Sequence, residues 1–217
     1  MKKRYLETIV KHYEDCLEKH GDSHLGVDWP KLEDVNKRYK VMLEIVKYYE
    51  DNAPSSTLLD FGSGAAHLLQ YIKDQGLGNI AYSGLDVSER FVALSREKFP
   101  AVPFYCVDIL EDSGSLPGFD YIVMNGVFTE KRELSFDEMW DYFCKMLSKV
   151  FSLANKGVAF NVMSKAVDWE RDDLFHVPTD LLIQFLTKNL TRNFIIRNDY
   201  GLYEYTTYIY KNKQSNT

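Results

Sequence analysis

A strand, a glycine turn and the start of a helix follow one another between residues 57 and 72, and this succession constrains the fold more than any other part of the chain. Residues 57–61 are apolar and β-prone, Gly62 and Gly64 permit a tight turn, and residues 65–72 have helical character. A turn of this kind brings free backbone N–H groups and a helix N-terminus against a ligand. The segment therefore predicts a ligand-binding loop at the end of a buried strand.

The spacing of the glycines separates this loop from two common phosphate-binding loops. A dinucleotide-binding loop has a third glycine, in the pattern G-x-G-x-x-G, and counting from Gly62 that position is His67. A P-loop needs a lysine directly after its last glycine, and no lysine follows here. The pattern that remains is Asp-x-Gly-x-Gly, in which Asp60 ends the strand.

The segment Asp60-Phe61-Gly62-Ser63-Gly64 resembles motif I of the class I methyltransferases, which use S-adenosyl-L-methionine. The resemblance implies that this methyl donor is the cofactor. It also implies that Asp60, Gly62, Ser63 and Gly64 bind it. The resemblance covers roughly residues 57–210 and leaves the N-terminal region outside.

Strands and helices alternate after the glycine loop, which predicts a parallel sheet with helices on both faces. The expected strands are 57–61, 80–85, 103–107, 119–125 and 157–163, and the expected helices are 64–75, 88–98 and 135–154. After a helix at 178–190, strands at 194–197 and 202–210 are joined by so short a turn that they must form an antiparallel hairpin. The expected fold is thus α/β, a seven-stranded, mostly parallel, doubly wound sheet with a C-terminal antiparallel hairpin, as in class I methyltransferases.

Two amphipathic helices precede this region, and we expect them to form a lid over the ligand site. They are expected at 5–17 and 33–49, with a connector at 20–32. The predicted organisation is an N-terminal helical lid, residues 1–53, and a cofactor-binding domain, residues 54–217. From this lid Arg38 could bind the cofactor carboxylate, and Trp29 could stack on a ligand. The alternative for Arg38 is a solvated side chain on the polar face of its helix, and the alternative for Trp29 is a local packing anchor.

Three further strand ends carry polar residues that should face the same crevice. Asp86 is placed to accept the ribose hydroxyls, with Val87 beside it, although Asp86 and Ser88 could also cap the following helix. The resemblance implies that Asp108 and the backbone of Ile109 meet the adenine ring. It likewise implies that Asn125 and Gly126, in the position of motif IV, lie beside the transferring methyl group.

Fewer residues of the sequence indicate where the methyl acceptor binds. His176 is the candidate general base, because the pKa of histidine ordinarily lies near neutrality, but it could instead close its loop or cap a helix. Phe128 and Trp169 are the aromatic candidates for the acceptor pocket, together with Trp29. The acidic run at 168–173 has no histidines at ligand spacing, so it favours a solvated loop, and no metal is expected.

Composition narrows the classes of function. The net charge of −6 offers no general attraction for nucleic acid, and no apolar run is long enough to span a membrane. Three isolated cysteines, Cys16, Cys106 and Cys144, favour a reducing cytoplasm. We therefore expect a cytoplasmic methyltransferase acting on an oxygen or nitrogen atom of a small polar metabolite or saccharide-like acceptor. A protein or RNA methyltransferase and a non-catalytic cofactor-binding scaffold are the alternatives, and the oligomeric state is not predicted.

Overall fold

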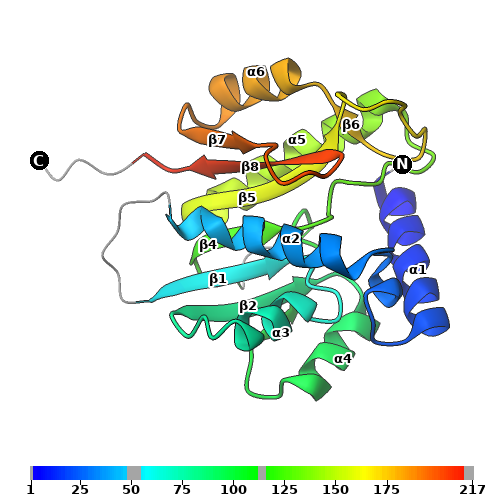
Figure 1. Ribbon diagram of the computed structural model, residues 1–217, viewed down its shortest axis with the longest axis vertical. Helices are drawn as coiled ribbons and strands as arrows, with labels where there is room; N and C mark the ends of the chain where they lie inside the picture. The colour runs from blue at the N-terminus through cyan, green and yellow to red at the C-terminus, as the bar shows by residue number, and fades with distance from the viewer. Residues whose placement is uncertain (1, 48–54, 112–115, 213–217) are drawn as a thin grey trace, which may run out of the picture.

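A central sheet of eight strands organises the protein in the computed structural model, which describes residues 2–47, 55–111 and 116–212, with side chains from Tyr5 onward (Figure 1). The strands are β1 (Ser56–Phe61), β2 (Ile80–Asp86), β3 (Phe104–Cys106), β4 (Phe119–Met124), β5 (Ala154–Ser164), β6 (His176–Val177), β7 (Phe194–Arg197) and β8 (Glu204–Tyr210). The helices are α1 (Lys2–His20), α2 (Leu32–Leu43), α3 (His67–Asp74), α4 (Glu89–Lys98), α5 (Phe136–Leu153) and α6 (Thr179–Asn189). Short 3₁₀ helices lie at η1 (Leu25–Val27) and η2 (Glu44–Lys47).

The strand order is β3-β2-β1-β4-β5-β8-β7, with β6 beside β5. The first five strands run parallel, and β8 runs antiparallel to both β5 and β7. The predicted fold class is therefore confirmed. Because β1 connects outward to β2 and the chain later returns to place β4 on its other side, the order reverses between β1 and β4. In open α/β sheets a ligand-binding crevice opens at the carboxyl ends of the strands at such a reversal.

Both faces of the sheet are covered, as the apolar strands require. Leu58 and Leu59 are neighbours in β1, point to opposite faces and are both fully buried. Helices α2, α3 and α4 share one apolar core with Leu58, while α5 and α6 share the other with Leu59. Each helix presents one apolar stripe to its core. In α5 the stripe is Met139, Phe143, Leu147 and Val150.

Several boundaries depart from the predicted elements: α2, for example, ends at Leu43 and is followed by η2, where one helix was predicted to run to residue 49. The short strand β6 was not predicted, because two residues give no periodic pattern. Helix α3 begins at His67, later than the predicted residue 64, because Ala66 adopts a left-handed conformation with φ 57° and extends the glycine loop. The later start leaves the backbone of residues 62–66 as an irregular turn against the crevice.

The two N-terminal helices differ in position. Helix α2 belongs to the core, where Val35, Tyr39 and Met42 are buried against the sheet side that carries α3. Helix α1 stands at the end of the sheet toward which β1 points (Figure 1). The predicted boundary at residue 53 lies outside the described residues.

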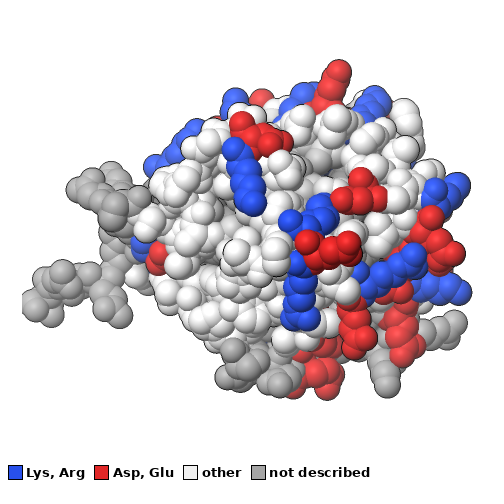
Figure 2. All heavy atoms as spheres, turned by 90° about the horizontal axis from the view of Figure 1, so that it is seen from below, with Lys and Arg blue, Asp and Glu red and all other residues white. Residues whose placement is uncertain are grey.

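The outer surface near α1 and α4 carries charges of both signs. Arg90 pairs with Glu18, and Lys98 pairs with Asp22, so these ion pairs link α4 to α1 and the turn after it. In Figure 2, basic and acidic side chains are interspersed on this face, and neither sign forms a continuous field. Among the described residues, none of the helices combines the length and apolar character needed to cross a membrane.

Candidate active site

A cavity of about 160 Å³ lies at the carboxyl ends of β1, β2 and β4 and is called the first cavity below. Its walls contain most of the residues that the sequence marked for the cofactor: Asp60, Gly62, Ser63, Gly64, Asp86, Val87, Asp108, Ile109, Asn125 and Gly126. Helix α1 covers it with Tyr5, Leu6, Ile9, Val10 and Tyr13. Residues separated by more than 100 positions in the sequence therefore surround one space.

Asp86 fixes the shape of the glycine loop. Its carboxylate accepts the Gly64 N–H at 2.9 Å and the Ser88 N–H at 2.9 Å, while the Ser88 hydroxyl caps α4 by accepting the Phe91 N–H. Burial raises the pKa of the Asp86 carboxyl, and these N–H donors lower it. Asp86 and Ser88 therefore have the local role at the start of α4 that was the alternative to ligand binding. The same carboxylate also lines the first cavity, where its unused lone pairs can accept ligand hydroxyls.

In this wall Glu130 Oε2 makes an ion pair with Arg132 but no hydrogen bond, and two other buried polar atoms have neither within the described part of the chain: Ser63 Oγ and Asn125 Oδ1. A buried polar atom without a partner destabilises a protein by about 1–3 kcal/mol, so such atoms indicate a missing group. Both residues line the first cavity. A polar ligand in that cavity would satisfy them, which fits a nucleoside-type cofactor.

Asp60 lies deeper, at the end of β1. Its side chain is 4% exposed and accepts the Tyr82 hydroxyl at 2.7 Å. Burial raises the pKa of Asp60 to about 7, although the Tyr82 hydrogen bond acts in the opposite direction. The first cavity thus contains a carboxyl group that changes charge near neutral pH.

We predict that Asp60 makes the stability of the protein depend on pH. An acid whose pKa is higher in the folded chain than its unfolded value of about 3.9 takes up protons on folding. Its contribution is therefore complete at pH values below about 4 and is lost as the pH rises through about 7. The Asp60→Asn variant should have a larger free energy of unfolding than the wild type at pH 8, with the difference narrowing toward pH 5. Denaturant unfolding at several pH values measures this, and a pH-independent difference would contradict it.

Gly126, in the turn after β4, is held by a chain of hydrogen bonds. Its N–H donates to Asn161 Oδ1 at 2.8 Å, and Asn161 Nδ2 donates to Glu204 Oε1 at 3.0 Å. The turn has φ 81°, and a Cβ on Gly126 would lie 2.7 Å from the Trp29 ring. Only glycine fits this position, because the conformation is left-handed and the indole packs directly on the backbone.

Arg38 has a different partner from the predicted one. Its guanidinium binds the carboxylate of Glu204, with Nε at 2.9 and 3.0 Å and Nη2 at 2.8 Å, and it lies 4.2 Å from the centre of the Trp29 ring. Glu204 is 1% exposed, so this is a buried ion pair. The expected contact of Arg38 with the cofactor carboxylate is replaced by this pair, and Arg38 does not line the first cavity.

A larger cavity of about 540 Å³, called the second cavity, adjoins the first. The two cavities share Tyr13, Val27, Trp29 and Glu130. Trp169 and Tyr203 stand at its exposed rim, with 72% and 64% of their surfaces accessible. Trp29 and Trp169, two of the aromatic residues predicted for acceptor binding, therefore both line the second cavity.

His176 lines the second cavity but is held by its own loop. Its Nδ1 lies 2.6 Å from the Ser164 carbonyl oxygen, and its Nε2 accepts the Arg171 N–H at 3.3 Å. The ring is 5% exposed and both nitrogens are used, so this geometry supports the loop-closing alternative over a general base.

Phe128 lies in the core instead of the predicted acceptor pocket. Its ring is fully buried, 4.7 Å from the ring centre of Phe143 and 6.3 Å from that of Phe160, and it lines neither cavity. The turn at Gly126 directs the side chain back between β5 and α5.

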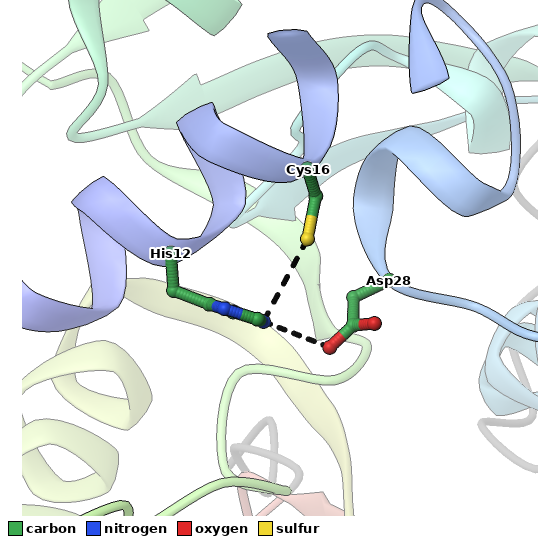
Figure 3. A group of neighbouring side chains, drawn as sticks. All are labelled: His12, Cys16 and Asp28. Carbon is green, nitrogen blue, oxygen red and sulfur yellow. Dashed lines mark hydrogen bonds and ion pairs between the residues drawn. The ribbon is translucent and has the colours of Figure 1, made fainter. Parts of the chain in front are cut away.

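Sequence reasoning missed Glu130, which lines both cavities, and the polar cluster beside it. His12 Nε2 lies 2.8 Å from Asp28 Oδ2 and 3.8 Å from Cys16 Sγ (Figure 3). His12 and Cys16 are four residues apart on one face of α1, which is a spacing visible in the sequence. Their closeness to Asp28 and Glu130 has no local signature, because three separate segments supply the side chains.

We predict that α1 and the connector become more protected when the cofactor binds. These segments border the first cavity, and the contacts that hold α1 to the sheet side include the Tyr5 hydroxyl, which donates to the Glu130 carbonyl, and the Ser88 hydroxyl, which donates to Glu14. Backbone amides of residues 5–31 should exchange more slowly after addition of S-adenosylhomocysteine. Amides of α2, which is already in the core, serve as the internal control. Equal exchange of residues 5–31 with and without ligand would mean that α1 is fixed structure.

Comparison with known proteins agrees with this geometry. Residues 59–149 match the family model described as a methyltransferase domain. Rv1506c of Mycobacterium tuberculosis, a protein whose assignment as a methyltransferase is itself provisional, is 27% identical over 161 residues, which are 70% of this chain and 91% of that protein.

Solved structures with the same fold contain the methyl donor or its product. Magnesium protoporphyrin IX methyltransferase from Synechocystis PCC 6803, with bound SAM, superposes with a TM-score of 0.62 at 16% identity and covers 95% of this chain and 97% of its own. The plantazolicin methyltransferase BpumL, in complex with a desmethylPZN analog and SAH, gives 0.59 at 13% identity and covers 96% and 98%. At these identities the superpositions show a shared fold.

Proposed function

Because the chain is a class I methyltransferase that uses S-adenosyl-L-methionine, we propose that it methylates an oxygen or nitrogen atom of a small polar metabolite or saccharide-like acceptor held in the second cavity. The observation that carries this proposal is the junction of the two cavities at Trp29, Tyr13, Val27 and Glu130. A methyl group can pass between two ligands only where their sites meet. This geometry supports one binding site for the donor and another for the acceptor.

The first cavity supplies the groups that would hold the cofactor. Asp86 offers acceptors for the ribose hydroxyls, and Ser63 Oγ and Asn125 Oδ1 are the buried atoms that need a partner. When bound, the cofactor supplies a methyl group on a positively charged sulfur, which is already activated for transfer. The protein therefore has to orient the acceptor and exclude water, and the apolar side chains of α1 that cover the cavity serve the second purpose.

The second cavity suits a small molecule with both apolar and polar groups. Its volume of about 540 Å³ falls within the ~300–1,000 Å³ that is typical of small-molecule sites. Indole and phenol rings at Trp29, Trp169 and Tyr203 offer flat apolar faces, while Asp34 and Asp168 offer hydrogen-bond acceptors. A saccharide-like ring that bears hydroxyl or amino groups could pack its apolar face on these aromatic rings and donate hydrogen bonds to these carboxylates.

Surface charge favours a small acceptor over RNA. The net charge is −6, and the face in Figure 2 carries interspersed charges in place of the basic patch that RNA binding uses. The neighbours of the same fold are named for acceptors as different as a protoporphyrin and plantazolicin. The fold alone therefore does not determine the acceptor, and the proposal depends on the residues that line the second cavity of this chain.

Incubation with methyl-tritiated S-adenosyl-L-methionine and fractionated cell extract tests the proposal. We expect label in the small-molecule fraction and none in the protein or RNA fractions. Label in the protein or RNA fraction would instead indicate a protein or RNA methyltransferase. Binding of S-adenosylhomocysteine without labelling of any fraction would indicate a scaffold that has no catalytic activity.

A further inference from the structure

Glu130 occupies the place where the two cavities meet. It follows the turn after β4, lines both cavities, and has a side chain that is 13% exposed. The other residues shared by the cavities are a valine, a tryptophan and a tyrosine. Burial raises the pKa of Tyr13 well above the ordinary value for tyrosine, so its hydroxyl keeps its proton. Glu130 is therefore the shared residue whose side chain offers a carboxylate that can accept a proton.

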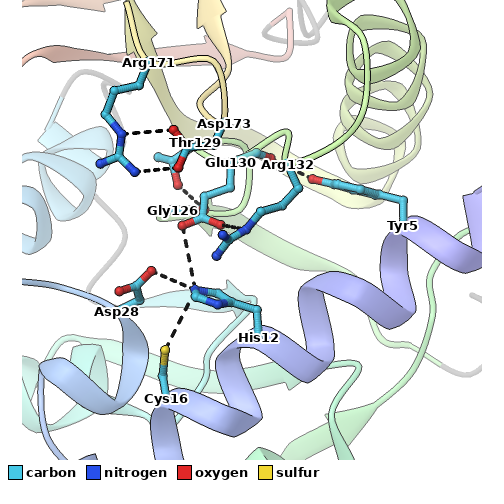
Figure 4. Close-up of polar contacts among 10 residues, drawn as sticks. All are labelled: Tyr5, His12, Cys16, Asp28, Gly126, Thr129, Glu130, Arg132, Arg171 and Asp173. Carbon is cyan, nitrogen blue, oxygen red and sulfur yellow. Dashed lines mark hydrogen bonds and ion pairs between the residues drawn. The ribbon is translucent and has the colours of Figure 1, made fainter.

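Glu130 lies among charged groups from three parts of the chain (Figure 4). Burial raises the pKa of its carboxyl, the nearby Arg132 and His12 lower it, and Asp28 raises it. Its Oε2 is 2.5 Å from Arg132 Nε, and its Oε1 is 4.0 Å from His12 Nε2. The titratable and charged groups that act on this site are Tyr5, His12, Tyr13 and Cys16 from α1, Asp28 from the connector, Arg132 from the same loop, and Arg171 and Asp173 from the loop after β5.

One ring nitrogen faces both carboxylates. His12 Nε2 is 2.8 Å from Asp28 Oδ2 and 4.0 Å from Glu130 Oε1. The exposed fraction of the side chains rises along this row, from 13% at Glu130 to 27% at His12 and 41% at Asp28. A carboxylate, an imidazole and a second carboxylate thus follow one another from the buried junction toward solvent.

We propose that Glu130 is the general base for the acceptor and that His12 and Asp28 carry its proton to solvent. The inference rests on the proposed function, since a base is needed only where the acceptor atom loses a proton. The acceptor oxygen or nitrogen forms a bond to the methyl carbon as the bond from that carbon to sulfur breaks, and the sulfur keeps the electron pair. The proton of the acceptor passes to the Glu130 carboxylate. His12 Nε2 gives the proton that it shares with Asp28 to the Asp28 carboxylate and on to water, and then takes the proton from Glu130 Oε1 across the 4.0 Å that separates the two atoms.

The same side chains could suggest a metal site, because His12, Cys16 and Asp28 present ligand atoms that lie within 4.8 Å of one another (Figure 3). One observation favours the proton path. The guanidinium of Arg132 pairs with Glu130 beside this cluster, and its positive charge would repel a bound cation.

The test compares the wild type with Glu130→Gln and His12→Gln, using as acceptor the small-molecule fraction that becomes labelled. Glu130→Gln should lower the initial rate at saturating donor at least a hundredfold, the usual range for loss of a general base. His12→Gln should lower it about tenfold. Affinity for S-adenosylhomocysteine should stay within twofold in both. Glu18→Gln is the matched control, because this α1 carboxylate is 72% exposed and pairs with Arg90 away from the cavities.

The pH profile distinguishes a base from a structural residue. The wild-type rate should rise with pH and then level off, whereas the rate of Glu130→Gln should keep rising in proportion to hydroxide. Parallel profiles for these two proteins, or an unchanged rate, would overturn the proton path while leaving the proposed function intact. Loss of wild-type activity with EDTA and its recovery with Zn²⁺ would also overturn it. If the wild type binds S-adenosylhomocysteine but labels nothing at any pH, the proposed function itself fails, and the inference with it.

Discussion

Replacement of Asp86 with alanine is expected to weaken the binding of S-adenosylhomocysteine at least tenfold while the chain stays folded. The carboxylate accepts the N–H groups of Gly64 and Ser88 and faces the first cavity, so its removal loosens the glycine loop and deletes the predicted ribose contact. A hydrogen bond to a charged group contributes about 1.5–3 kcal/mol, and 1.4 kcal/mol corresponds to a factor of ten in affinity. Isothermal titration calorimetry measures the change.

The matched control for this experiment is Asp141→Ala, on the exposed side of α5, where the aspartate pairs only with Lys145 among the described residues. That variant should bind with wild-type affinity. Equal affinity in Asp86→Ala and Asp141→Ala would show that Asp86 is a loop residue with no role in cofactor binding.

Replacement of Arg38 with alanine is expected to lower the free energy of unfolding by about 3–5 kcal/mol, because it leaves the carboxylate of Glu204 buried without its partner. Glu204 is 1% exposed and keeps only the Asn161 amide as a donor among the residues described. For a chain of this size the loss corresponds to a fall in Tm of roughly 6–20 °C. Thermal and denaturant unfolding measure it.

A double replacement gives the control for Arg38. The variant that carries Arg38→Met together with Glu204→Met removes both charges, and it should regain most of the stability that Arg38→Ala loses. A loss below 1 kcal/mol in Arg38→Ala would mean that solvent reaches Glu204.

The sheet could be predicted because its determinants are local. Apolar runs such as residues 119–124 and the glycines at 62 and 64 mark the strands and the binding turn directly. The polar residues Asp86 and Asp108 follow strands, and parallel strands bring their carboxyl ends to one edge. For that reason the residues predicted for the cofactor, apart from Arg38, line one cavity, although their individual contacts with the cofactor stay predictions.

The rest depends on contacts between distant segments. Arg38 meets Glu204 across 166 residues of sequence, so no pattern near Arg38 shows that its charge is already paired. The sequence near His176 does not show that the fold places the Ser164 carbonyl and the Arg171 N–H against its ring. Glu130 was missed because its importance comes from lying between two cavities, which is a property of the folded chain alone.

A crystal structure of the chain with S-adenosylhomocysteine tests the central claim most directly, namely that transfer takes place where the two cavities meet. The account predicts the ribose hydroxyls on Asp86 and the sulfur atom in the first cavity, facing Glu130 and the opening to the second cavity. A ligand bound outside the first cavity, or a sulfur atom directed away from that opening, would contradict it.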